Sequence, residues 1–473
     1  MWNALRTYLR YTSWPILAAM IALVVMGIVA IHVSEPADSD LTGFAAKQWK
    51  FALVGLAVFI AMTLIPYQKL GQFSYLMFAV TLVMLAGIFL LPSVRGSHRW
   101  IDAGPIKIQP SEIAKFTFII MLAWYLRYGE HYRRLAGLIL PFLLTLVPMG
   151  LILLEPDLGT GLLFPPTLFF MLFMAGAKLR HLLVILAMGL FLVLVPVVQP
   201  VDKDAFLGEV QRGGFVTRKL GPVTFYSVDE SREWTKRPAF PLVYCRFQVG
   251  QGGVYDLQPL SLQVMMGHDQ TAERAQRVTA WLRPDDPRMA KGKGYQPRLA
   301  RRVLASGGWT GRGDWGELDR LFRVLPDDHT DFIFCVVGAQ WGFLGCAALL
   351  FLYGVIFVFG VEIASITYDP FARLLAVGVL ALLFSQIVIN VGMTMGLTPV
   401  TGMTLPLVSY GGSSLVVNCA ALGLLVNVGQ RRPILLSRRP FEFGTKKEKP
   451  PSPYSPVADG AWAPGISDSQ RDR

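Results

Sequence analysis

Ten long apolar segments, each almost free of charged residues, limit the folds open to this chain of 473 residues. Most approach the ~20 residues that an α-helix needs to cross ~30 Å of hydrocarbon. Alternating ten-residue strands, the pattern of a membrane β-barrel, do not occur, so the segments predict helices. They cover residues 14–33, 51–67, 73–92, 116–126, 135–154, 158–176, 181–199, 333–360, 374–396 and 407–429.

The distribution of basic residues predicts how these helices are oriented. Lys and Arg favour the cytoplasmic side of a membrane. With the N-terminus inside, the cytoplasmic segments hold 16 of these residues and the opposite short loops hold 5. We therefore predict an all-α polytopic membrane protein with ten transmembrane helices, a multi-pass topology and both termini cytoplasmic. This topology accounts for most of the net charge of +12, so nucleic acid is not expected as a partner.

The same pattern divides the chain into four parts. Residues 1–199 hold transmembrane helices 1–7, and residues 333–430 hold helices 8–10. Between helices 7 and 8 lies a large extracytoplasmic loop, 200–332, in which 201–270 reads as a β-rich insertion because short β-like runs are separated by glycine. The tail, 431–473, is basic and then rich in Pro and Ser, and is predicted to be disordered in the cytoplasm.

Charged residues near the ends of the apolar segments mark possible chemistry. Glu112 and Lys115 lie three apart, hence on one face of a helix. They read either as a self-neutralising pair or as ionisable groups that face a cavity. Trp100 is typical of the aromatic belt at a membrane interface. Alternatively, Arg99 beside it could hold a phosphate or the face of a sugar.

Two further stretches carry carboxylates at the outer ends of segments. Glu155 and Asp157 join two apolar segments and read as a cation site or as a solvated turn, of which the turn is favoured. Asp331 directly precedes a wholly apolar segment, where a carboxylate serves either as a helix N-cap or as a general base. Residues 396–414 are rich in glycine and proline, and Ser413 near a helix start would offer N–H groups to an anion. A simple re-entrant turn and close packing at the glycines are the alternatives there.

These motifs, taken in order, resemble the SEDS family of bacterial membrane proteins, which includes RodA, FtsW and SpoVE. The resemblance spans about 400 residues, everything but 201–270 and the tail. The matching pieces are Arg99-Trp-Ile, Gln109-Pro-Ser-Glu-Ile-Ala-Lys115, Pro156-Asp-Leu-Gly-Thr160, Gln276-Arg277, Gly294-Tyr-Gln296, Ser306-Gly-Gly308, His329-Thr-Asp-Phe-Ile-Phe334, Asn390-Val-Gly-Met393, Pro399-Val-Thr-Gly402 and Ser409-Tyr-Gly-Gly-Ser-Ser414.

The resemblance implies a peptidoglycan glycosyltransferase that polymerises lipid II at the outer face of the bacterial cytoplasmic (inner) membrane. It implies that a class B penicillin-binding protein is the partner and that Asp331 is the catalytic residue. We expect the lipid bilayer and lipid II as further partners. The residues expected to bind substrate are Arg99, Trp100, Glu112, Lys115, His329, Thr330 and Ser413. Where the family usually shows an acidic pair, this chain has Ala339-Gln340.

The expected reaction needs a base for the acceptor 4-hydroxyl and cations for the departing pyrophosphate. Those cations are Arg and Lys side chains or a divalent cation, Mg or Mn; no residue is assigned as a metal ligand and no organic cofactor is expected. A lipid II flippase is the alternative function, because charged residues and glycine-rich backbone also line transport pathways. A scaffold protein with a degenerate active site is a further alternative.

Overall fold

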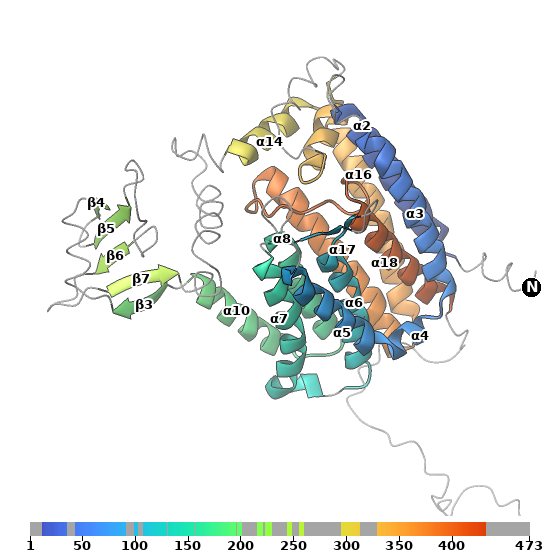
Figure 1. Cartoon of the computed structure of the whole chain (residues 1–473), viewed down its shortest axis with the longest axis horizontal. Helices are drawn as coiled ribbons and strands as arrows, with labels where there is room; N and C mark the ends of the chain where they lie inside the picture. The colour runs from blue at the N-terminus through green and yellow to red at the C-terminus, as the bar shows by residue number, and fades with distance from the viewer. Residues whose placement is uncertain are drawn as a thin grey trace, which may run out of the picture. The chain divides into compact units, whose positions relative to one another are not determined.

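Helices built from the apolar segments form nearly all of the protein that the computed structural model describes (Figure 1). The described residues are 12–35, 43–90, 99–102, 107–129, 131–155, 157–194, 196–200, 215–220, 223–228, 244–247, 255–259, 295–312 and 329–431, all within the unit Met1–Pro433. The helices are α2 (Trp14–Ser34), α3 (Phe44–Leu64), α4 (Tyr67–Gln72), α5 (Ser74–Gly87), α6 (Pro110–Leu126), α7 (Ile139–Leu154), α8 (Leu158–Gly161), α9 (Phe164–Met174), α10 (Leu179–Leu194), α14 (Tyr295–Ser306), α16 (Ile333–Ile366), α17 (Pro370–Met395) and α18 (Gly412–Gln430). Short 3-10 turns cover Ile88–Leu90, His131–Arg133 and Leu135–Leu138.

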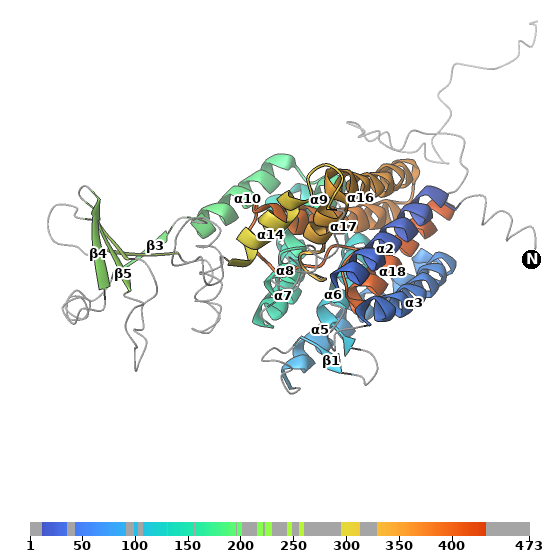
Figure 2. The same cartoon turned by 90° about the horizontal axis from the view of Figure 1, so that it is seen from above.

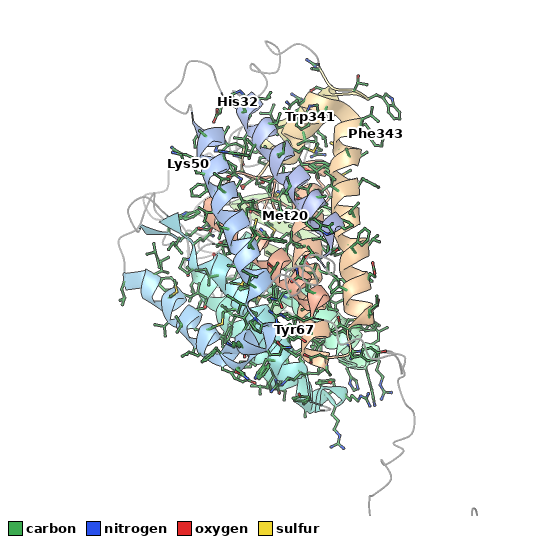
Figure 3. All side chains as sticks on the ribbon, turned by 90° about the vertical axis from the view of Figure 1, so that its right-hand side faces the viewer. Met20, His32, Lys50, Tyr67, Trp341 and Phe343 are labelled. Atoms are coloured by element: carbon green, nitrogen blue, oxygen red, sulfur yellow. The ribbon has the colours of Figure 1, made fainter. Side chains whose placement is uncertain are left out.

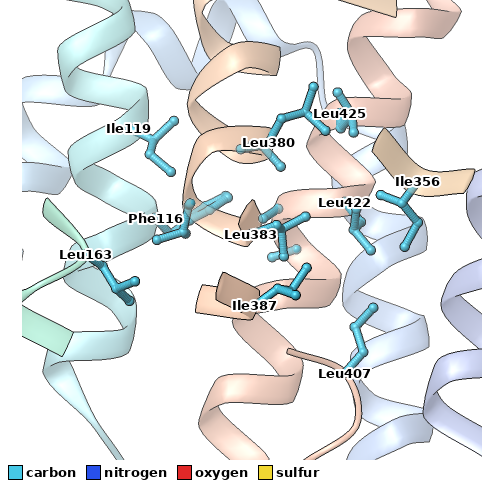
Figure 4. Close-up of a cluster of buried hydrophobic side chains, with 14 of the residues drawn as sticks. Phe116, Ile119, Leu163, Ile356, Leu380, Leu383, Ile387, Leu407, Leu422 and Leu425 are labelled. Atoms are coloured by element: carbon cyan, nitrogen blue, oxygen red, sulfur yellow. The ribbon is translucent and has the colours of Figure 1, made fainter. Parts of the chain in front are cut away.

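Helices α17 and α18 form the centre of the bundle and are buried along most of their length (Figures 1 and 2). α17 packs against α6, α9 and α16, whereas α18 packs chiefly against α3, and α2 lies along α16. Figure 4 shows the core between α6, α17 and α18, where Leu380, Leu383 and Ile387 of α17 meet the side chains of Phe116 and Leu422. Apolar side chains fill this core, and the outer helices also expose large apolar side chains, as expected of surfaces that face lipid.

The bundle has two distinct ends. Figure 3 shows His32, Trp341 and Phe343 at one end and Tyr67 at the other. α17 starts at the Tyr67 end, where the Asp369 carboxylate accepts a hydrogen bond from the Phe371 N–H at 3.0 Å. We call the opposite end, which contains the C-termini of α2, α7 and α17 and the N-termini of α3, α6, α16 and α18, the site end.

Six helices are long and apolar enough to cross a membrane: Trp14–Ser34, Phe44–Leu64, Leu135–Leu154, Ile333–Ile366, Pro370–Met395 and Gly412–Gln430. Three shorter apolar helices cover Ser74–Leu90, Leu158–Met174 and Leu179–Met188. The prediction of a helical, membrane-spanning fold is therefore confirmed. Of the ten predicted transmembrane helices, six are long enough in the described structure to cross a membrane.

Two predicted helices are shorter than their apolar segments because proline interrupts them. Segment 158–176 is split into α8 and α9, and Pro165 and Pro166 occupy the first turn of α9, where their missing N–H groups are not needed. Segment 181–199 was predicted to be helical throughout, and this is wrong at its end. α10 stops before Pro196, which begins strand β3 (Pro196–Pro200), because proline disfavours a helical residue before it.

Helix α16 is interrupted at Gly342, whose backbone is left-handed with φ 64° and ψ −158°. A Cβ at this position would collide with the Gly311 N atom, so only glycine fits. The interruption frees the N–H groups of Phe343 and Leu344, which donate to the carbonyls of Gly308 and Trp309 at 2.8 and 3.1 Å. These bonds fasten the segment 307–312 to the start of the second part of α16, and the Arg312 N–H, which donates to the Ala339 carbonyl at 3.0 Å, fastens it to the first part.

Strands account for the rest of the described elements. β1 (Ile101–Asp102) pairs with β2 (Lys107–Ile108), and β3 pairs with β7 (Tyr255–Pro259), both antiparallel. β4 (Phe215–Leu220), β5 (Val223–Val228) and β6 (Tyr244–Phe247) form a third antiparallel sheet. β4 to β7 fall inside 201–270, the range predicted to be rich in β-structure.

Candidate functional site

Asp331, the predicted base, lies at the site end immediately before α16, and its side chain is partly exposed. Its backbone carbonyl accepts a hydrogen bond from the Asn390 side-chain amide at 2.9 Å, and the same amide donates to the Met403 carbonyl at 2.5 Å. A Cβ on Gly402, whose φ is 70°, would lie 3.4 Å from the Asp331 Oδ2 atom. Helix α17 thus holds the backbone of Asp331, and Gly402 lies against its carboxylate. Asp331 is not the N-cap of α16, which is Phe332.

The two residues before Asp331 are held through their backbone. The Tyr410 N–H donates to the His329 carbonyl at 2.9 Å, and the Ser409 hydroxyl donates to the Thr330 carbonyl at 2.5 Å. The His329 ring stacks on Phe44 of α3 with 4.7 Å between centroids. His329 and Thr330 therefore tie segment 329–331 to segment 409–410 and α3.

Gln48 of α3 is a residue that the sequence predictions missed. Its side-chain amide donates to the Ser409 carbonyl at 3.0 Å, and its Oε1 atom accepts from the Gly411 N–H at 3.3 Å. Gln48 is 1% exposed, so it serves backbone groups that water cannot reach. Gln48 lies between Lys47 and Lys50, before the predicted apolar segment 51–67, so no signal in the sequence singles it out.

Asp157 is the centre of a hydrogen-bond network that joins α6 to α8. Its Oδ2 atom accepts from the Gln109 amide at 3.0 Å, the Ser111 hydroxyl at 3.3 Å and the Thr160 hydroxyl at 2.8 Å. Its Oδ1 atom accepts from the Thr160 N–H at 3.2 Å, which caps α8. Asp157 is 4% exposed. The favoured prediction of a solvated turn is therefore wrong, because the turn is folded inward between helices.

Glu155 lies in the same turn and is 0% exposed. It directly follows the candidate span Leu135–Leu154. Burial, with a further contribution from Asp157, raises the pKa of Glu155 to about 8, although Arg99 opposes the change. Among the described residues, neither carboxyl oxygen of Glu155 has a hydrogen-bond partner.

Arg99 and Ser413 are brought to this network from distant parts of the sequence. The Arg99 Nε–H donates to the Glu155 carbonyl at 3.0 Å. The Ser413 hydroxyl, in the first turn of α18, accepts from the Gln109 N–H at 3.4 Å. Trp100 is partly exposed next to Arg99. A serine predicted to present N–H groups to an anion thus also fastens the start of α6 to the start of α18.

Glu112 and Lys115 form an ion pair inside α6, with 2.7 Å between the Lys115 Nζ atom and Glu112 Oε1. The two residues are 4% and 3% exposed. The Glu112 Oε2 atom has no hydrogen-bond partner among the described residues. The ion pair agrees with the first reading of the sequence, the self-neutralising pair, whereas the reading in which the two groups face a cavity stays a prediction.

Contacts link most of these groups into one site. Gly159 of α8 lies against the Thr401 and Gly402 carbonyls, because a Cβ added to Gly159 would lie 2.9 and 3.3 Å from their oxygens, and Gly402 lies against Asp331. A partly exposed carboxylate, the Arg99 cation and a buried polar network therefore meet at one end of the bundle. Such a site suits proton abstraction next to an anionic leaving group. No group of three or more metal-binding side chains is found within the described ranges.

The chain matches the family FTSW_RODA_SPOVE, described as cell cycle protein, over residues 13–206 and 255–433. It is 31% identical over 438 residues to "Peptidoglycan glycosyltransferase RodA" of Treponema pallidum (strain Nichols), covering 89% of this chain and 98% of the relative. It is 30% identical over 430 residues to "Probable peptidoglycan glycosyltransferase FtsW" of Shewanella sediminis (strain HAW-EB3), covering 88% and 86%.

Among solved structures, the fold is similar to a chain reported under "Structural coordination of polymerization and crosslinking by a peptidoglycan synthase complex". The TM-score is 0.62 at 25% identity, and the match covers 88% of this chain and 97% of that one. Together with the six candidate spans, these likenesses identify a multi-pass membrane protein.

Proposed function

The chain belongs to the FtsW/RodA/SpoVE family of cell cycle proteins, and we propose that it is a peptidoglycan glycosyltransferase that polymerises lipid II into glycan strands. Relatives that carry this activity in their names match nearly their whole length. The observation that carries the proposal is the meeting of Asp331 with Arg99 and the Asp157 network at one end of the bundle.

The proposed topology places this end at the outer face of the bacterial cytoplasmic membrane. The six candidate spans, the three shorter apolar helices and α6 would together supply ten crossings, with both chain termini in the cytoplasm. The loop 200–332 then follows the seventh crossing on the outer side. The site supports this arrangement. Its residues come from the C-terminal ends of some helices and the N-terminal ends of others, as expected when successive helices cross the membrane in opposite directions.

In the proposed mechanism, the Asp331 carboxylate accepts the proton of the acceptor sugar's 4-hydroxyl as that oxygen attacks the anomeric carbon of the donor. The bond from that carbon to undecaprenyl pyrophosphate breaks, and the anomeric configuration inverts. Arg99 offers positive charge to the departing pyrophosphate. Lys115, which we also expected to bind substrate, is 3% exposed and paired with Glu112, so we assign it no direct contact with the pyrophosphate. His329 and Thr330 position Asp331 through the backbone bonds described above, and Trp100 and Ser413 line the substrate's path.

A divalent cation, Mg²⁺ or Mn²⁺, belongs to the proposal as a further counter-charge for the pyrophosphate. The described residues do not assemble a set of protein ligands for it: Asp157 already accepts four hydrogen bonds, and Glu112 is paired with Lys115. No residue is therefore proposed as its ligand.

The proposed partner is a class B penicillin-binding protein, which would crosslink the strands that this chain makes. Support comes from the similar solved chain, which belongs to a peptidoglycan synthase complex. Named relatives include both RodA and FtsW, so the chain is proposed to act in cell elongation or in division.

The decisive experiment is polymerisation of lipid II by the purified chain, with and without its partner, comparing the native protein with Asp331→Asn. We expect Asp331→Asn to abolish polymerisation while the protein still elutes as a folded species in detergent. Glu362→Gln, the same carboxylate-to-amide change at an exposed position near the other end of α16, is the control. Lipid II transport across vesicles without polymerisation would instead support a flippase, and undiminished polymerisation by Asp331→Asn would remove Asp331 from the mechanism.

A further inference from the structure

Glu155 combines complete burial with a carboxyl group that the rest of the described structure does not serve. It is 0% exposed, and both of its carboxyl oxygens are without a hydrogen-bond partner among the described residues. An ionised carboxylate in such a place loses its hydration and gains no hydrogen bond from the described residues in return; only the charge of Arg99 favours it. A neutral carboxyl group tolerates the same surroundings far better.

The contrast with Asp157, two residues later, shows that the site distinguishes its two acids. Asp157 accepts four hydrogen bonds, the arrangement that suits a negative charge. Glu155 lies close enough to Asp157 for the two to repel each other if both are ionised. The surroundings of the Asp157 side chain therefore suit a charged carboxylate better than those of Glu155 do.

Arg99 is the second charged group that acts on Glu155 among the described residues. Its Nε–H donates to the Glu155 backbone carbonyl at 3.0 Å, which keeps the guanidinium next to this turn. A negative charge on the Glu155 side chain would lie beside that guanidinium. It would weaken the attraction of the whole region for any anionic ligand, whatever else Arg99 contacts.

We propose that Glu155 is a positioning residue that remains uncharged in the working protein, so that the region around Arg99 keeps its affinity for the pyrophosphate of the substrate. This inference rests on the proposed function, because the anion concerned is the pyrophosphate of lipid II. It gives a role to Glu155, which the sequence analysis had assigned to a solvated turn.

The sign of the expected pH dependence follows from the neutral state. The pKa of about 8 means that Glu155 carries its proton at pH 7 and loses it as the pH rises above 8. Ionisation then opposes binding of the anion, and binding of the anion in turn strengthens proton binding by Glu155. If the neutral form is the one that binds, the KM for lipid II rises about tenfold between pH 7 and pH 9, with a smaller change in kcat.

The test compares the native protein with Glu155→Gln, which has the same shape and cannot ionise, and with Glu362→Gln as the exposed control. We expect Glu155→Gln to polymerise lipid II at pH 7 within about twofold of the native rate and to lack the rise in KM that the native protein and Glu362→Gln show. Infrared spectroscopy of the native protein should show the carbonyl band of a protonated carboxyl group that disappears near pH 8 and is missing in Glu155→Gln. Equal KM profiles for the native protein and Glu155→Gln would overturn the inference.

Binding of undecaprenyl pyrophosphate, measured without turnover, separates this inference from the proposed function. Loss of affinity above pH 8 in the native protein, absent in Glu155→Gln, supports the role of Glu155 even if neither protein polymerises lipid II. In that case the failure belongs to the proposed function. Affinity that is independent of pH in both proteins counts against Glu155.

Discussion

Replacement of Gly159 by alanine tests whether α8 positions Asp331. A Cβ at Gly159 would lie 2.9 Å from the Thr401 carbonyl oxygen, whereas ordinary contacts begin at 3.4 Å. The backbone at 401–402 must therefore move away by about 0.5 Å, the difference between these distances. Gly402 in turn lies against the Asp331 carboxylate, so the displacement is passed to the proposed base.

The expected loss of activity follows from that displacement. A misplacement of 1 Å costs about 10²-fold in rate, so a shift of half that size predicts a loss of about tenfold in the polymerisation rate. Overpacking at such a buried contact also lowers the free energy of unfolding by about 1–3 kcal/mol. Both effects are large enough to measure in one preparation.

The assay is the rate of lipid II polymerisation by purified protein, combined with thermal unfolding in the same detergent. Gly150→Ala is the matched control, because a Cβ there meets no atom within 4 Å and Gly150 lies in the neighbouring helix α7. We expect Gly150→Ala to keep its activity and to gain up to about 1 kcal/mol of helix stability. Native rates and an unchanged melting temperature for Gly159→Ala would refute the idea that α8 supports the Asp331 segment.

Two further predictions concern stability. Lys115→Met leaves the buried Glu112 carboxylate unpaired and should lower the free energy of unfolding by about 3–5 kcal/mol. The double variant with Glu112→Gln should restore most of this loss. Equal melting temperatures for Lys115→Met and the native protein would contradict the prediction. Gly342→Ala places a side chain at φ 64° against the Gly311 backbone and should destabilise the protein by more than about 1 kcal/mol. Gly354→Ala, in open space on the same helix, should not, as thermal unfolding of both would show.

The apolar segments predicted the helices well because membrane-length hydrophobic runs leave the backbone few alternatives. The breaks in those helices were harder to place. Pro165 and Pro166 lie inside segment 158–176, which was predicted as one helix, and they start a new helix there, since the missing N–H of proline is harmless only in the first turn. The interruption at Gly342 depends on carbonyls contributed by 308–309, and nothing in the local sequence of α16 specifies them.

The candidate site was predictable in its residue types and less so in its surroundings. Asp331, Arg99 and Ser413 were selected from sequence, and the structure brings all three to the site end, while their roles in the reaction remain predictions. Gln48 was missed because it lies beside Lys47 and Lys50, where a polar residue is ordinary, and its backbone partners at 409 and 411 are far away in the sequence. Asn390 lay in a motif, but its two carbonyl partners come from other segments.

The order of the residues alone is enough to establish that this chain is a helical membrane protein and which residues carry charge next to its apolar segments. Hydrophobic length and the bias of Lys and Arg are local properties, so they can be read without coordinates. The burial of Glu155 and Asp157 emerges only from the folded bundle, in which four donors serve Asp157 and none of the described residues serves the Glu155 carboxyl group. The charge state of an acid depends on the neighbours that folding brings to it. Here Gln109, Ser111 and Arg99 come from 46 to 56 residues away in the sequence.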